Sequence, residues 1–255
     1  MTSPAVSVAI EGAIGRITFT VPDRLNSLDA AMLESLTVEV ARLDADPRVR
    51  VIVLAGEGRA FSAGANITAH EDMGDLDATL FGLGSVVRAI LEARTPVLSL
   101  VPGVAAGAGL SLALAADYVL VADDAKLLLA FGALGLMPDG GATSLVVASI
   151  GRARALRLAL TGEKLSGATA AEWGLVSESV AAEGFSARAD ELIAHLASLA
   201  PDGTALTTAA ITDAALDLDA TLDREERGQH ALLRTDDFAE GLAAFREKRR
   251  PTFGR

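Results

Sequence analysis

The sequence contains no cysteine among its 255 residues. Disulfide bonds, thiolate metal ligands and a cysteine nucleophile are therefore excluded. Aromatic residues make up only 4% of the chain, although hydrophobic residues make up 51%. The core must consequently be filled by Ala, Val and Leu, and such aliphatic interiors are typical of buried parallel strands covered by helices.

Positive charge is also scarce, since 22 Lys and Arg stand against 34 Asp and Glu. The net charge of −12 argues against a broad surface for nucleic acid or anionic lipid, so a nucleic-acid role for the basic run 246–250 is the weakest functional hypothesis. No apolar run reaches membrane-spanning length, and residues 1–5 lack a signal-peptide pattern. We expect a cytoplasmic protein with no membrane or nucleic-acid partner.

Strand and helix patterns alternate through the first part of the chain, residues 1–196. A helix is predicted where Met32, Leu36, Val40 and Leu43 recur at helical spacing, with Ser27 or Asp29 as its cap. Further helices are predicted around 85–93, 142–150 and 152–161, the last two separated by a glycine, and strands at 6–10, 14–21, 49–55, 97–101, 118–122 and 126–130. This alternation predicts α/β layering with parallel strands and ligands at the strand-to-helix turns.

The pattern changes in residues 197–255, where no strand is predicted. Amphipathic helices are expected near 202–216, 221–233 and 236–248. A helical extension of this kind often packs on a neighbouring subunit.

Two turns rich in small residues follow predicted strands, at 61–67 (Phe-Ser-Ala-Gly-Ala-Asn-Ile) and 103–109 (Gly-Val-Ala-Ala-Gly-Ala-Gly). Small residues let a ligand approach the main chain, and where a turn opens a helix its N–H groups face that ligand. Each turn alone is more simply explained as a tight strand–helix connection. Two such turns side by side can instead present two N–H donors to one developing oxyanion.

Together the turns resemble the enoyl-CoA hydratase/isomerase (crotonase) superfamily, and the resemblance extends over essentially the whole chain. Further matching motifs are Leu25-Asn26-Ser27-Leu28, the stretch 134–141 (Leu-Gly-Leu-Met-Pro-Asp-Gly-Gly), Thr161-Gly162 and the C-terminal stretch 240–249. The stretch 130–139 is especially similar to the 1,2-epoxyphenylacetyl-CoA isomerase branch. The resemblance implies a spiral of repeated β-β-α units over 1–196. It also implies a helical trimerisation region over 197–255, with trimers stacking into hexamers.

The resemblance further implies an acyl-CoA thioester substrate and a set of site residues. The main-chain N–H groups of Ala65 and Ala108 would form the oxyanion hole. The residues implied to contact the substrate or its coenzyme A are Arg24, Leu25, Ala63, Gly64, Asn66, Ile67, Gly107, Ser111, Phe131 and, from another subunit, Phe245 and Lys248. Lys248 competes with a plainer interpretation as one charge of a solvated tail. No cofactor beyond the coenzyme A of the substrate is implied.

The chain departs from hydratases of this family at their two catalytic glutamates, whose positions fall at Ser111 and Phe131. Neither side chain can relay a proton near neutral pH, which argues against ordinary hydration. One carboxylate remains, Asp139, where isomerase branches place a single Glu or Asp. One carboxylate suffices to move a proton between two carbons, and an apolar pocket would raise its pKa. Pro-Asp-Gly is also ordinary turn chemistry, so the catalytic role depends on the resemblance.

Two other interpretations are weaker on the sequence. A serine hydrolase is disfavoured because Gly109-Leu110-Ser111-Leu112-Ala113 breaks the G-x-S-x-G motif. A metal site at Glu71, Asp72, Asp75 and Asp77 is disfavoured because a solvated acidic loop explains these residues better. The leading hypothesis is an acyl-CoA isomerase with Asp139 as base; the alternatives are a hydratase with altered acid–base groups and a non-catalytic acyl-CoA-binding protein.

Overall fold

The fold is that of a computed structural model, which describes residues 5–67 and 73–254. Its larger sheet has six strands in the order β1-β2-β3-β5-β7-β10. Their bounds are β1 Val6–Glu11, β2 Ile14–Phe19, β3 Val51–Gly56, β5 Val97–Val101, β7 Tyr118–Ala122 and β10 Glu178–Val180. β1 and β2 form an antiparallel pair, and every later neighbour is parallel. The predicted α/β class with a parallel sheet is confirmed.

A second, smaller sheet was not predicted as such, although the strand predicted at 126–130 is one of its members, β8. It consists of short strands in the order β4-β6-β8-β9, namely β4 Ala60–Ser62, β6 Val104–Ala106, β8 Lys126–Leu128 and β9 Leu165–Ser166. The chain visits the two sheets in turn, with β3 then β4, β5 then β6, and β7 then β8. This is the repeated β-β-α spiral that the resemblance implied. Three residues are too few to show a period-2 pattern, and the sequence therefore predicts only a turn at 103–109, where the structure has β6.

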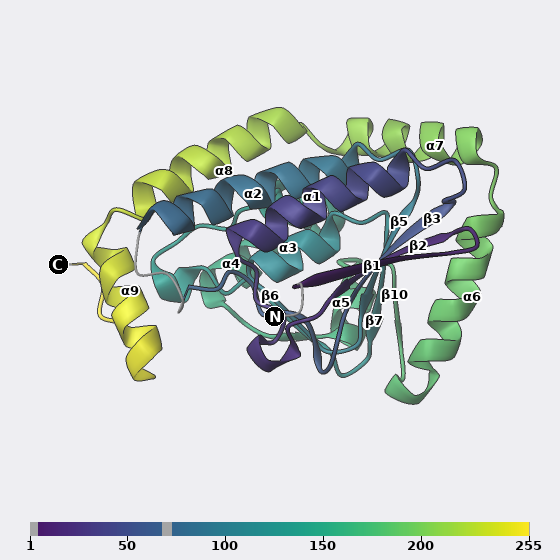
Figure 1. The fold of residues 1–255 in the computed structure, drawn as a ribbon. Coiled ribbons are helices and arrows are strands. Elements are labelled where there is room, and N and C mark those ends of the chain that lie inside the picture. The colour runs from purple at the N-terminus through teal and green to yellow at the C-terminus, as the bar shows by residue number, and fades with distance from the viewer. Residues whose placement is uncertain (1–4, 68–72, 255) are drawn as a thin grey trace.

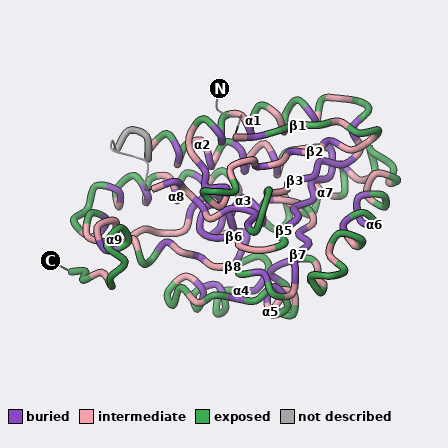
Figure 2. The backbone as a smooth tube through the Cα atoms, turned by 60° about the horizontal axis from the view of Figure 1, so that its bottom comes forward, coloured by how far each residue is buried: buried purple, intermediate pink, exposed green. Residues whose placement is uncertain are grey.

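The larger sheet is apolar on both faces because alternate residues of its strands face opposite ways. In β3, Ile52 and Leu54 belong to the main core together with α1 (Ala30–Asp44) and α2 (Met73–Leu91). Val51 and Val53 belong instead to a second core, closed by Leu192 and other residues of α6 (Phe185–Ser198). Figure 2 shows the buried backbone gathered in the central strands and the exposed backbone along α6 and α9. The sheet is therefore covered on both faces.

The predicted helices agree with the structure apart from their lengths. The four residues at helical spacing in α1 are all buried, and the carboxylate of Asp29, not Ser27, caps the helix by accepting from Met32 N at 3.0 Å. α4 (Ala142–Thr161) is broken at Gly151, which has φ +73°, where the sequence separates two helices. α2 begins well before the predicted 85–93 helix. The remaining short elements of this region are α3 (Ala108–Leu114), α5 (Gly167–Trp173), η1 (Pro22–Arg24), η2 (Gly132–Leu134) and η3 (Ala182–Gly184).

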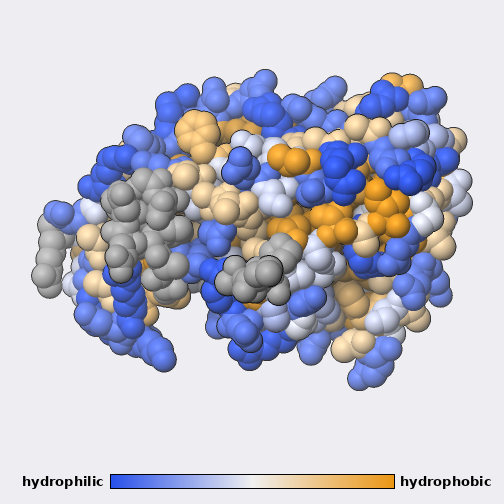
Figure 3. Space-filling view, in the orientation of Figure 1, coloured by the Kyte–Doolittle hydropathy of each residue, from blue (hydrophilic) through white to orange (hydrophobic). Residues whose placement is uncertain are grey.

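The C-terminal region is helical, as predicted, with α7 Pro201–Ala215, α8 Leu218–Leu232 and α9 Asp236–Glu247. α8 lies along α2, and α9 packs on η2 with its lower end projecting from the body (Figure 1). The space-filling view shows a notch between this projecting end and the rest of the molecule (Figure 3). α6 runs continuously across the predicted boundary at residues 196 and 197, so the division into core and extension stays a prediction. No helix in the described ranges is long and apolar enough to cross a membrane.

Candidate active site

The smaller sheet brings the two turns together. β4 and β6 are parallel neighbours, so the turns that follow them leave the same edge of the sheet. The turns touch at Gly64, where a Cβ atom would lie 2.7 Å from Ala106 O and 3.4 Å from Ala108 N. Gly64 also has φ +95°, a conformation that L side chains rarely adopt. Glycine is therefore required at this point of contact.

The main chain of Leu28 fixes the orientation of Ala65. Leu28 N donates to Gly64 O at 2.8 Å, and Asn66 N donates to Leu28 O at 2.8 Å. Since the residues on either side of Ala65 bond to Leu28, the N–H of Ala65 itself points to the opposite side. Among the main-chain hydrogen bonds between described residues, this N–H donates none.

Ala108 supplies a second unused N–H at the start of α3. The N–H groups of Leu110 and Ser111 both turn back to Gly107 O, at 2.9 and 3.1 Å. The first N–H groups of a helix have no acceptor within the helix, and the described part of the chain offers none to Ala108. Gly107 makes the sharp entry with φ +51° and ψ −127°.

Both alanines line one cavity of about 50 Å³, and Asp139 lines it too. Its other walls come from α2, α8 and α9 and from the segments beside them: Ile67, Thr79, Leu80, Leu83, Leu136, Gln229, Leu233 and Phe238. Apart from Asp139, none of these side chains carries an ionisable group. The cavity thus combines two unused N–H donors and one carboxyl group with apolar walls, which is the arrangement that enolate chemistry requires.

Asp139 is buried, with 7% of its surface exposed. Burial raises the pKa of this carboxyl group to about 7; a hydrogen bond from Gln229 opposes the shift, and the charge of buried Glu225 adds to it. Its main-chain oxygen accepts from Ala142 N at 3.2 Å. Asp139 therefore forms the turn that its Pro-Asp-Gly context predicts and also directs its side chain into the cavity.

Two residues of α8 complete the surroundings of the carboxyl group, and neither was predicted. Gln229 Nε2 donates to Asp139 Oδ2 at 2.7 Å. Glu225 accepts from Gly141 N at 2.6 Å and from Thr143 N at 2.8 Å, at the start of α4. Their partners lie more than 80 residues earlier in the chain, and α8 is otherwise rich in charged residues, so no local signal marks them as buried.

The Enoyl-CoA hydratase/isomerase family model matches residues 9–255 of this chain. The chain belongs to the enoyl-CoA hydratase/isomerase family. The 1,2-epoxyphenylacetyl-CoA isomerase of Escherichia coli (strain K12) is 37% identical over 251 residues, covering 96% of each chain. A probable enoyl-CoA hydratase of Rhodobacter capsulatus is 38% identical over 266 residues, covering 99% of each. The crystal structure of an enoyl-CoA hydratase from Mycobacterium avium subsp. paratuberculosis K-10 superposes with a TM-score of 0.93 at 40% identity, covering 100% of each chain.

Ser111 and Phe131, which the resemblance assigns to the positions of the family's glutamates, do not line the cavity. Ser111 is fully buried, and its hydroxyl group donates to Gly107 O at 3.3 Å. Phe131 is also buried, with its ring close to Gly107. The structure thus places Ser111 within the packing of α3, where it contacts the segment of Asp139 through Gly140.

The residues implied for coenzyme A are dispersed in this single chain. Ala63 and Leu25 are joined by a main-chain hydrogen bond of 2.9 Å, next to the first turn. Arg24 lines a separate open groove and lies 3.6 Å from Asp29, while Asn66 is buried. The coenzyme A groove stays a prediction.

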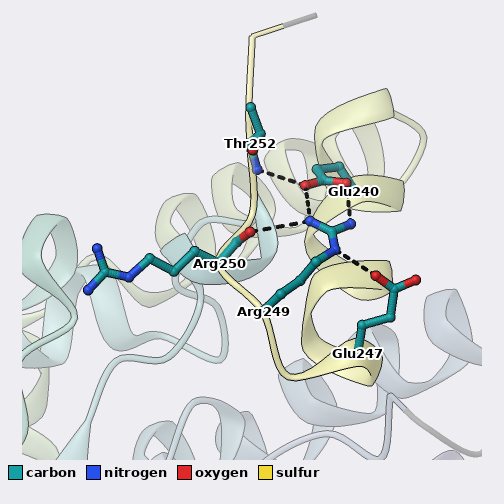
Figure 4. Close-up of polar contacts among 5 residues, drawn as sticks. All are labelled: Glu240, Glu247, Arg249, Arg250 and Thr252. Carbon is teal, nitrogen blue, oxygen red and sulfur yellow. Dashed lines mark hydrogen bonds and ion pairs between the residues drawn. The ribbon is translucent and has the colours of Figure 1, made fainter.

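Phe245 and Lys248 lie at the exposed end of α9. Phe245 is 54% exposed, and Lys248 ends the helix with φ +55°. The neighbouring Arg249 is held by Glu240 at 2.7 Å and Glu247 at 2.6 Å, as Figure 4 shows. One cation of the basic run is therefore already paired with carboxylates of α9, which weakens the nucleic-acid hypothesis further.

The acidic stretch considered as a metal site lies partly outside the described residues, which exclude Glu71 and Asp72. Asp77 is bound by Arg234 at 2.7 Å and lies 3.4 Å from His230. Within the ranges that the structure describes, no group of three or more His, Asp or Glu side chains is placed to hold a metal ion.

The raised pKa of Asp139 predicts how stability depends on pH. A folded-state pKa of about 7, above the ordinary 3.8, means that the folded protein holds this proton more tightly than the unfolded chain. The resulting stability is fully present below about pH 4 and is lost as the pH rises through 7. The side chain in Asp139→Asn cannot ionise. The free energy of unfolding of this variant should therefore exceed that of the wild type by a few kcal/mol at pH 8 and match it near pH 4. Urea unfolding at both pH values measures this difference.

Asp46→Asn is the matched control, because the exposed Arg48 lowers the pKa of the Asp46 carboxyl group to about 2. Removal of the Asp46 carboxyl group should not raise the free energy of unfolding at pH 8. Equal pH dependence in the wild type and Asp139→Asn would show that Asp139 is ionised in the folded state at no cost.

Proposed function

We propose that this protein isomerises an acyl-CoA thioester through an enolate, with Asp139 as the only acid–base group. The observation that carries this proposal is that two unused N–H donors and a buried carboxyl group with a pKa of about 7 line one cavity. Isomerase and hydratase names both occur among the relatives, so the choice between them depends on the cavity. Coenzyme A enters as part of the substrate, and no further cofactor is needed.

In the proposed reaction the Asp139 carboxylate takes a proton from a carbon of the acyl group. The electron pair of that C–H bond moves toward the thioester oxygen, where the N–H groups of Ala65 and Ala108 receive the developing negative charge. Each such donor contributes about 3 kcal/mol of transition-state stabilisation in known oxyanion holes. The protonated Asp139 then returns the proton to a different carbon, which shifts the double bond. A pKa near 7 suits a group that must both accept and donate at neutral pH.

Replacing Asp139 by Ala should abolish turnover and leave binding nearly intact. A positioned acid–base group contributes about 10²–10⁴-fold to the rate, and the oxyanion donors would remain in place. Steady-state kinetics on a panel of enoyl-CoA thioesters, with calorimetric titration of the same ligands, separates the two effects. Unchanged turnover would refute the role of Asp139. Binding without conversion of any panel member by the wild type would favour the non-catalytic alternative.

A hydratase is the second candidate, favoured by one observation. Gln229 Oε1 is a buried acceptor with no partner among the described residues, and it lies in the same cavity as the unpartnered Asp139 Oδ1. Two acceptors at one site can orient a water molecule, which is the task of the two glutamates in the family's hydratases.

Turnover in H₂¹⁸O distinguishes the two reactions. The isomerase proposal predicts a product with no solvent oxygen, because Asp139 returns the proton that it removed and no water is added. Mass spectrometry of the product acyl-CoA measures the ¹⁸O label. Stoichiometric ¹⁸O in the product would establish hydration in place of isomerisation.

We further propose that the chain forms a homotrimer, with two trimers stacked as a hexamer. Exposed apolar side chains on the C-terminal helices support this proposal: Leu206 and Ile211 of α7 are 69% and 64% exposed, and Phe245, near the C-terminal end of α9, is 54% exposed. Contact with another subunit would cover this apolar surface. Light scattering coupled to size-exclusion chromatography should give three or six times the chain mass of 26.1 kDa, and a monomer would contradict the proposal.

A further inference from the structure

Helix α8 carries a buried polar stripe that the proposed reaction does not yet use. Thr221, Glu225 and Gln229 follow one another at intervals of four residues and therefore share one face. All three are almost fully buried, with 1%, 1% and 3% of their surfaces exposed. Gln229 is the only glutamine in the chain. A row of buried polar groups is costly unless each has a defined partner, so the partners indicate what the stripe does.

The first two residues of the stripe fasten α8 to the start of α4. Glu225 accepts from Gly141 N, Thr143 N and the Thr143 hydroxyl group, and thereby caps α4, the helix that begins three residues after Asp139. The hydroxyl groups of Thr221 and Ser144 form a second link. Thr143 and Ser144 belong to the first turn of α4, so α8 is held in a fixed position relative to the turn that contains Asp139.

Glycine at position 228 permits the close approach that Gln229 needs. A Cβ atom there would collide with Met137 Sδ, two residues before Asp139. The next residue, Gln229, reaches Asp139 and donates from Nε2 to Oδ2 at 2.7 Å. Within the described part of the chain, Asp139 Oδ1 has no hydrogen-bond partner. The two carboxyl oxygens are therefore unequal, because Gln229 holds one and the other has no partner.

We propose that Gln229 is the positioning residue for the Asp139 base: its amide holds Oδ2, so that Oδ1 alone faces the substrate carbon. This inference rests on the proposed function, in which Asp139 moves the proton. An anchored carboxylate loses less orientational freedom on reaching the transition state than a freely rotating one. The same hydrogen bond stabilises the ionised form, so Gln229 also affects the fraction of Asp139 that can act as a base.

The two α8 residues act on Asp139 in opposite directions. The hydrogen bond from Gln229 lowers the pKa of Asp139, whereas the nearby carboxyl group of Glu225 raises it. The other side chains facing the cavity, from α2 and α9 and from the turns, have no ionisable group. A change at Gln229 should therefore appear directly in the titration of Asp139, without a competing charge from another element.

Titration of Asp139 by ¹³C NMR of protein labelled at the aspartate carboxyl carbon tests this inference without relying on turnover. Its resonance is assigned by its loss in Asp139→Asn. Gln229→Met keeps the length of the side chain but removes the donor, so the midpoint should rise by about one pH unit. Gln229→Glu places a second carboxyl group beside Asp139, and the shared proton should raise the midpoint further. Thr221→Val is the matched control: it should lower the melting temperature and leave the midpoint unchanged.

With an active acyl-CoA substrate, Gln229→Met should lower kcat about tenfold or more, even above the new midpoint, with little change in KM. The low-pH limb of the kcat/KM profile should move to higher pH with the NMR midpoint. A midpoint that stays at the wild-type value in Gln229→Met, with only the melting temperature lowered, would overturn the inference and leave Gln229 a structural residue. If no acyl-CoA is converted, the proposed function fails, and the NMR titration still decides whether Gln229 controls Asp139.

Discussion

The parallel pairing of two three-residue strands, β4 and β6, is the contact on which the site depends. Because the strands run in the same direction, the turns that follow them meet at one edge, and Ala65 and Ala108 line one cavity. The larger sheet stabilises this arrangement from a distance, since β3 precedes β4 and β5 precedes β6 in the chain. A fold with a large apolar core thus positions the main-chain N–H groups of two alanines, which substitution of their side chains by any residue other than proline would not remove.

The second constraint is the burial of ionisable groups in this apolar surrounding. Asp139 and Glu225 are both buried, and burial raises the pKa of each carboxyl group. The two groups differ in their partners: Glu225 accepts hydrogen bonds from Gly141 and Thr143, whereas Asp139 has one oxygen without a partner. Glu225 is thus occupied in joining α8 to α4, whereas Asp139 retains one oxygen without a partner among the described residues. Hydrogen-bond partners, rather than burial, separate the carboxylate that joins two helices from the one that we propose as the base.

Much of this organisation could be predicted from the sequence. The apolar strands β5 and β7 have the predicted bounds, and the spacing of Met32, Leu36, Val40 and Leu43 predicts the buried face of α1. Asp139 was identified because it is the one carboxylate left at the family's catalytic positions. β4 and β6 escaped prediction because three residues are too few to show alternation. Gln229 escaped because no local pattern marks it as buried and its partner is 90 residues away.

The distance in sequence between α8 and the groups it contacts has a consequence for biogenesis. The last strand of the larger sheet, β10, ends at Val180, so a growing chain has all its strands before α8 emerges from the ribosome. Until then Asp139 has neither Gln229 nor Glu225 beside it. The hydrogen bond and the nearby charge that act on its carboxyl group from α8 are therefore acquired only when the C-terminal region folds.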